Sequence, residues 1–170
     1  MKTSFRGRGL VWIASTVLWL LGGVEGTPAS ADPDPSSGGF QAEQIHVFKT
    51  PTCGCCVQWV EHLKAAGFDV KTTDLPDLTA LKRSNGVPRA MAACHTALVG
   101  GYVIEGHVPA SDIRRLLEDR PRLAGLAVPG MPIGSPGMEH PDPRRHEVFD
   151  VMAFGAASET GFEVFATHAP

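Results

Sequence analysis

The chain has 170 residues, with 15 Lys and Arg, 18 Asp and Glu, and a formal net charge of −3. This slightly acidic balance excludes a strongly basic nucleic-acid-binding protein, because few cations are available to neutralise phosphates. Hydrophobic residues make up 43% and charged residues 19%, which is ordinary for a globular protein and excludes a largely disordered one. The length suits one domain with an appendage.

The N-terminus has the layout of a secretory signal peptide. Lys2, Arg6 and Arg8 give a positive start, an apolar run covers 10–21, and Ala29-Ser30-Ala31 supplies an A-x-A cleavage pattern. The apolar run is shorter than the ~20 residues of a membrane span. We therefore predict a signal peptide over residues 1–31, cleaved after Ala31, with no membrane segment in the mature chain. An uncleaved anchor is the alternative.

A flexible leader over 32–43 precedes the first predicted elements, because it is rich in Pro, Ser and Gly. Gln44 to Lys49 has strand composition, residues 53–66 repeat apolar side chains at helical spacing before Gly67, and 68–73 alternates as a strand does. Strand, helix and strand in so short a span predict a βαβ unit with parallel strands.

A second helix is predicted over 77–84 and a third over 109–118, with Pro109 in its first turn. Between them, the β-rich runs 95–99 and 102–105 flank Gly100-Gly101, which is typical of a tight hairpin. The predicted fold class is therefore α/β, with the order β-α-β-α-β-β-α over residues 44–120.

The remainder, residues 121–170, is predicted to be a Gly/Pro/Met-containing C-terminal arm that packs on the domain. It includes the segment 130–138, which is rich in Gly, Pro and Met. Two strand-like runs follow at 147–154 and 161–166, and they predict an extra β-hairpin.

Cys53 and Cys56 form a C-x-x-C motif where the first strand meets the first helix, which is typical of a thioredoxin-like redox site. The backbone N–H groups and dipole of a helix N-terminus favour a thiolate there. Val87-Pro88, just before the hairpin, matches the place where thioredoxin-like folds put a cis-proline.

A simple dithiol exchanger has no use for the third thiol of Cys55, whereas a soft-metal site does. Cys94 adds a fourth thiol and His95 an imidazole at the start of the hairpin. Four converging thiolates select Cu(I), Zn(II) or an iron–sulfur cluster, and the paired C-x₂-C spacings of structural zinc are absent. Thioether and imidazole ligands beside thiolate suit copper best, and they could come from Met131, Met138, His107 and His140.

Alternative roles remain open for these residues at this point. The four cysteines could form two structural disulfides, although adjacent and near-adjacent pairs would be strained. Met131 and Met138 could pack the arm against the core. His95 could be a ligand or a core hydrogen-bonder, because neighbours on a strand point to opposite faces. His107 could order a loop, and Glu105 could orient His107 or lie on the surface.

Taken together, these motifs resemble the CopG-type periplasmic copper-resistance proteins, over roughly residues 44–154. The resemblance implies a thioredoxin-like fold and a cysteine-bridged multinuclear copper cluster, with Cys53, Cys55, Cys56 and Cys94 as thiolate ligands and the Met131 and Met138 loop close by. It also implies copper handling in the periplasm, with Cu(I)/Cu(II) interconversion as a suggested activity. The segments that carry the resemblance are 49–56, 86–88, 93–97, 102–109 and 130–139.

We therefore expect a periplasmic copper-binding protein of copper resistance, whose partners are copper ions and other periplasmic copper-handling proteins. Two other functions remain as alternatives. One is a thiol–disulfide oxidoreductase that uses Cys53 and Cys56. The other is a passive copper chaperone that hands the metal to a partner.

Overall fold

The computed structural model describes residues 43–155 and 161–169, which belong to one compact unit over 39–170. The predicted signal peptide and nearly all of the predicted leader lie outside the described residues. Within the described residues, no helix is long and apolar enough to cross a membrane.

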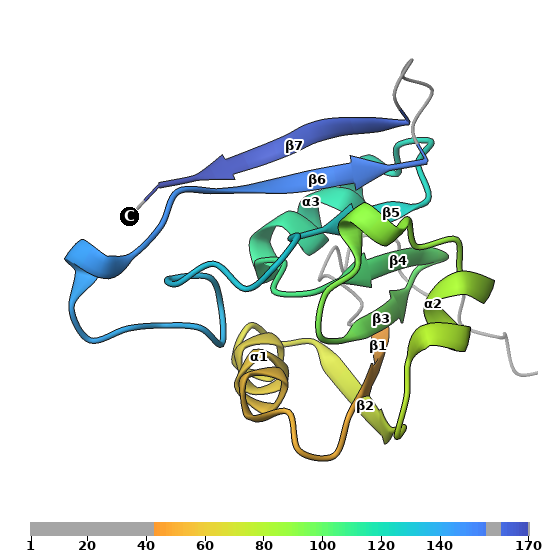
Figure 1. Ribbon diagram of the computed structural model, residues 1–170. Coiled ribbons are helices and arrows are strands. Elements are labelled where there is room, and N and C mark those ends of the chain that lie inside the picture. Colours follow the sequence, from red (N-terminus) through yellow and green to blue (C-terminus); the bar gives the residue numbers. More distant parts are fainter. Residues whose placement is uncertain (1–42, 156–160, 170) are drawn as a thin grey trace, which may run out of the picture. The chain divides into compact units, whose positions relative to one another are not determined.

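The first part of the chain forms the predicted βαβ unit (Figure 1). Strand β1 spans Gln44–Lys49, helix α1 spans Gly54–Ala65, and strand β2 spans Asp69–Asp74 and pairs parallel with β1. Gly67 follows α1 with φ +87°, and its N–H donates to the Lys64 carbonyl. This is the left-handed C-terminal cap that the sequence predicted, and it turns the chain back toward the sheet.

Helix α2 spans Thr79–Ser84, and the short 3₁₀ helix η1 spans Arg89–Met91. No peptide bond in the described ranges is cis, so Val87-Pro88 matches the cis-proline of thioredoxin-like folds in its place along the chain only. Pro88 instead precedes η1 in an extended conformation, and its carbonyl accepts the first hydrogen bond of η1 from Met91 N–H.

The predicted hairpin consists of β3, Thr96–Val99, and β4, Tyr102–Glu105, which pair antiparallel. Gly100 and Gly101 both have positive φ, as the two central residues of a type I′ hairpin turn require. Helix α3 follows over Ala110–Asp119, with Pro109 at its N-cap. The predicted α/β fold class, including the order β-α-β-α-β-β-α, is thus confirmed.

The C-terminal region extends the same sheet. Strand β5, Gly125–Ala127, pairs parallel with β4, and the strands β6, Phe149–Phe154, and β7, Phe162–His168, form the hairpin that the sequence predicted. A short 3₁₀ helix, η2, spans Pro143–Arg145 and precedes β6 in the chain. The result is one mixed seven-stranded sheet with the order β2-β1-β3-β4-β5-β6-β7.

The two faces of the sheet carry different apolar clusters because neighbouring strand residues point to opposite sides. Helices α1 and α3 pack on one face, where Trp59 and Ile113 are fully buried with Ile104 of β4. The other face carries a smaller cluster that joins Met91 of η1 to Val103 and Phe154. The segment that leads to Cys94 is therefore held against the sheet, on the face opposite to α1.

Candidate metal centre

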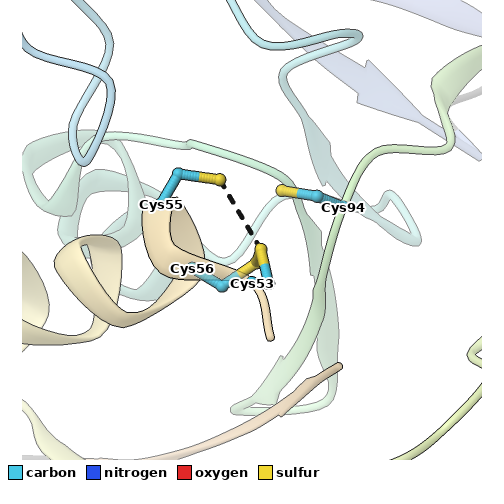
Figure 2. Close-up of side chains that lie close together, drawn as sticks. All are labelled: Cys53, Cys55, Cys56 and Cys94. Carbon is cyan, nitrogen blue, oxygen red and sulfur yellow. Dashed lines mark hydrogen bonds between the residues drawn. A yellow bond between two sulfur atoms is a disulfide. The ribbon is translucent and has the colours of Figure 1, made fainter. Parts of the chain in front are cut away.

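The fold brings all four cysteines to one point. Cys53 is the N-cap of α1, Cys55 and Cys56 lie in its first turn, and Cys94 lies in the loop just before β3. Their sulfur atoms all lie within 4.8 Å of one another. Figure 2 shows that Cys94, on the segment before β3, faces the three cysteines at the start of α1. Sulfur atoms this close can bind a common metal ion or bridge several.

The four sulfurs are in two oxidation states. Cys53 and Cys56 form a disulfide, whereas Cys55 and Cys94 are free thiols. Cys55 Sγ lies 3.5 Å from Cys53 Sγ (Figure 2). The donor set fits a soft metal such as Cu(I), but a disulfide must first take up two electrons and two protons before it supplies two thiols. The fit therefore applies to the reduced protein.

Two histidines lie beside Cys94. His95 Nδ1 lies 3.1 Å and His107 Nε2 lies 3.2 Å from Cys94 Sγ. These three residues form a second group whose ligand atoms are close enough to bind a metal. Strand β3 begins only at Thr96, so the alternation of a strand does not yet separate His95 from Cys94. The side chains of His95 and Cys94 can therefore lie at the same metal site.

Burial keeps both imidazoles neutral. His95 is fully buried beside the Trp59 ring, and this burial, reinforced by His107 and Lys82, lowers the pKa of His95 to about 3. Burial also lowers the pKa of His107, although its hydrogen bond to Pro136 opposes the shift. Neutral imidazole nitrogens are the form that binds metals.

The tautomer of His107 follows from its hydrogen bond. Its Nδ1 lies 2.8 Å from the carbonyl oxygen of Pro136, which can only accept, so Nδ1 carries the proton. In the neutral ring Nε2 then has a free lone pair, and this lone pair faces Cys94. His107 thus both orders the loop at Pro136 and presents a ligand atom, so the two roles that the sequence left open are compatible.

Burial raises the pKa of Cys94 to about 12, with a further contribution from the neighbouring Cys55. The metal-free Cys94 is therefore a thiol at neutral pH. Metal binding to its sulfur would have to displace that proton.

The loop 130–138 packs closely against the start of α1, which carries Cys55. A Cβ atom at Gly137 would stand 2.7 Å from both the Cys55 carbonyl oxygen and the Trp59 backbone nitrogen, so only glycine allows this approach. Met138 follows Gly137 and is partly buried, whereas the Met131 side chain is 53% exposed. His140 turns elsewhere, with its ring nitrogens near Asp142 and Arg145. The loop therefore reaches the site at Gly137 and at Pro136, whose carbonyl oxygen accepts a hydrogen bond from His107.

Glu105 has neither of the roles considered from the sequence. Its carboxylate is fully buried and accepts hydrogen bonds from Ala93 N–H and the Thr96 hydroxyl, both at 2.7 Å, while Lys82 forms an ion pair with it. Burial raises the pKa of Glu105, and the contacts with Lys82 and Ala93 oppose this shift. Because Ala93 precedes Cys94, Glu105 fixes the loop that carries this cysteine.

Sequence reasoning missed this network. Lys82 lies on α2 and Glu105 on β4, so no local pattern joins them, although the hairpin register does place Glu105 opposite Thr96. The one signal in the sequence was the charged Glu105 at the end of the otherwise apolar strand β4.

Comparison with known proteins places the chain in a family. Two solved structures described as "Copper resistance protein copG", forms 2 and 1, are each 42% identical to this chain, with TM-scores of 0.69 and 0.68. The matches cover 76% and 75% of this chain and 100% and 98% of theirs. The chain belongs to the CopG copper resistance family. A family model described as "Protein of unknown function, DUF411" matches residues 91–138, and none of the curated proteins matches.

The matched segment 91–138 contains much of the site outside α1. Cys94, His95 and His107 lie within it, as do Met131 and Met138. In this CopG family member the segment therefore runs from Cys94, through the hairpin, to the loop that contacts the start of α1.

Proposed function

We propose that this protein is a periplasmic copper-binding protein of copper resistance, whose reduced cysteines hold a multinuclear Cu(I) cluster. The observation that carries the proposal is the convergence of the sulfurs of Cys53, Cys55, Cys56 and Cys94 within 4.8 Å of one another. The CopG relatives are named as copper resistance proteins, which supports copper as the metal.

The chemistry of the donors supports Cu(I) over harder ions. Thiolates are soft ligands, and a thiolate can bridge two copper ions, so four of them can hold more than one metal. The lone pair of His107 Nε2 and the buried ring of His95 add neutral ligands beside Cys94. The contact of Gly137 with the first turn of α1 supports a covering role for the loop, with Met138, and less so the exposed Met131, as further ligands.

Metal stoichiometry tests the cluster directly. After reduction and anaerobic loading, we expect more than one Cu(I) per chain, and titratable free thiols should fall from four as copper binds. Zinc should not displace the copper, because thiolate sites bind Cu(I) more tightly. Saturation at one equivalent would reject the cluster, and displacement by zinc would reject copper as the preferred metal.

A thiol–disulfide oxidoreductase is the second candidate, and the Cys53–Cys56 disulfide at the start of α1 favours it. Cys55→Ser separates the two functions. This change removes one bridging thiolate and should greatly weaken copper binding, while the Cys53/Cys56 pair keeps its spacing and any exchange activity. Insulin reduction at thioredoxin-like rates by the wild type, with unchanged copper affinity in Cys55→Ser, would favour the oxidoreductase.

Redox cycling of bound copper and its transfer to other periplasmic copper-handling proteins are further parts of the proposal. A passive chaperone would bind and release Cu(I) without a change of oxidation state. Reversible oxidation of the loaded protein, followed by absorption and electron paramagnetic resonance spectroscopy, distinguishes the two. Cu(II) signals that appear on oxidation and vanish on reduction, without loss of metal, are expected for a redox-active cluster.

A further inference from the structure

A cavity of about 860 Å³ lies beside α2 and η1 and has no part in the copper site described above. Its lining includes three cationic side chains, those of Lys82, Arg83 and Arg89, together with Thr79 and the apolar Val87 and Ala92. Among the residues that the structure describes, no acidic one lines it. In a chain with a net charge of −3, this is a local concentration of positive charge.

The two arginines have unused hydrogen-bonding capacity. Neither the Arg83 nor the Arg89 side chain forms a hydrogen bond or ion pair with a residue in the ranges 43–155 and 161–169, and both residues are exposed. Arg83 interacts with Asp77 only through longer-range electrostatics, because the Asp77 carboxylate accepts its hydrogen bonds from Thr79. Each guanidinium is therefore free to form a two-pronged contact with an oxyanion.

Lys82 contributes charge from the inner side of the cavity. Its ammonium group pairs with the buried Glu105 and also donates to Thr96 Oγ1 at 2.9 Å. The Lys82 charge is thus partly neutralised, so the two arginines are the main source of unpaired positive charge. The carboxylate of Glu105 lies behind Lys82 and is fully buried, so it is not exposed to a ligand in the cavity.

The size of the cavity indicates an organic ligand. Small-molecule sites have volumes of roughly 300–1,000 Å³, and a single inorganic ion would leave most of 860 Å³ unfilled. A Cβ atom at Gly86 would meet nothing within 4 Å, so the cavity is open toward the turn between α2 and η1. Two separate guanidinium groups are suited to a ligand that carries more than one anionic group.

We propose that this cavity binds an anion that carries two or more carboxylate or phosphate groups. The anion contacts Arg83 and Arg89, and its apolar part lies against Val87 and Ala92. Such groups occur in free metabolites and in acidic segments of proteins, and the cavity recognises the chemistry that both share. This site does not depend on copper, so its test is made on the metal-free protein.

The test is calorimetric titration of the copper-free mature protein at low salt with three probes: tricarballylate, pyrophosphate and a hexaglutamate peptide. We expect saturable binding of at least one probe, and amide NMR shifts concentrated around Gly86 and Ala92. Arg83→Gln and Arg89→Gln should each weaken it by about tenfold, as expected for the loss of one charge-assisted contact. Arg122→Gln is the matched control, because Arg122 is exposed and does not line the cavity.

Each outcome decides the proposal. Binding of tricarballylate or pyrophosphate identifies a free polyanion as the ligand, and binding of the peptide alone identifies an acidic protein segment. No saturable binding of any probe would overturn the proposal. An equal loss in Arg122→Gln and Arg83→Gln would also overturn it, because it would show general charge attraction. All three arginines are exposed, so unchanged melting temperatures should confirm that the variants fold.

Discussion

At the scale of single residues, Glu105 links the cysteine site to the rest of the protein. Its carboxylate connects Lys82 of α2, the backbone of Ala93 and the hydroxyl of Thr96. A buried carboxylate with this many donors is stable only while all of them are in place, because an unpaired buried charge is costly. The conformation of the loop before Cys94 therefore depends on an ion pair that does not touch the cluster.

Glu105→Gln should destabilise the fold by about 2–4 kcal/mol, because it leaves the Lys82 ammonium group, whose side chain is 14% exposed, without a counter-charge. Urea unfolding of the copper-free protein measures this loss. Lys82→Met should be destabilising for the converse reason. The double variant should recover part of the loss, since it contains no unpaired charge. Single-variant effects below about 0.5 kcal/mol, as for an ordinary surface change, would contradict the role given to the pair.

At the scale of elements, the site depends on how closely the loop 130–138 approaches the first turn of α1. Gly137 has φ +83°, and a Cβ atom there would overlap backbone atoms of Cys55 and Trp59. The backbone atoms of α1 are fixed by the hydrogen bonds of the helix, so a side chain at position 137 would displace the loop instead. The close approach of this loop to α1 thus requires glycine at position 137.

Gly137→Ala should cost more stability than Gly130→Ala, which is its matched control. Gly130 has a similar φ of +76°, but a Cβ atom there would meet nothing within 4 Å. Gly130→Ala should therefore cost only the roughly 1–2 kcal/mol of left-handed backbone strain. Gly137→Ala should cost additional stability because it also displaces the loop. The copper-loaded Gly137→Ala variant should also lose Cu(I) to a chelator faster than the Gly130→Ala variant does. Thermal unfolding and chelator-transfer rates measure both effects, and equal results for the two variants would contradict the close approach.

Some elements were predictable because their signals are local. The apolar spacing of α1, the Gly100-Gly101 turn and the alternation in β6 and β7 are each contained in a short stretch of sequence. Strand β5 was missed because three residues are too few for an alternating pattern. Its Gly125 is explained only by the assembled sheet, in which a Cβ atom would lie 1.9 Å from the Val103 carbonyl oxygen.

At the scale of the whole molecule, the candidate site is a junction of four segments that are distant in sequence. The start of α1, the loop at Cys94, the turn at His107 and the loop at Gly137 all meet there. The sequence supplied the cysteine cluster because Cys53, Cys55 and Cys56 are neighbours. It could not supply the pairing of His107 with Cys94 or the burial of Glu105, since these follow from tertiary packing.

Copper bound at this junction would connect segments that only the fold brings together. If Cys94 is a ligand, bound copper stabilises the native state over the unfolded chain, in which the sulfur atoms are dispersed. Such a ligand adds about 2.7 kcal/mol at a free concentration of 100 times its dissociation constant. Copper should therefore raise the melting temperature of the reduced wild-type protein, by an amount set by the free copper concentration relative to the dissociation constant.

Cys94→Ala should remove most of this copper-induced gain, together with part of the copper stoichiometry. The metal-free variant should melt close to the wild type, because Cys94 is only partly buried and its contacts with His95 and His107 are weak thiol hydrogen bonds. Differential scanning calorimetry of both reduced proteins, with and without Cu(I), separates the two effects. An equal copper-induced gain in both proteins would remove Cys94 from the site. The metal would then be bound by Cys53, Cys55 and Cys56 alone, within one turn of helix, and would join nothing beyond it.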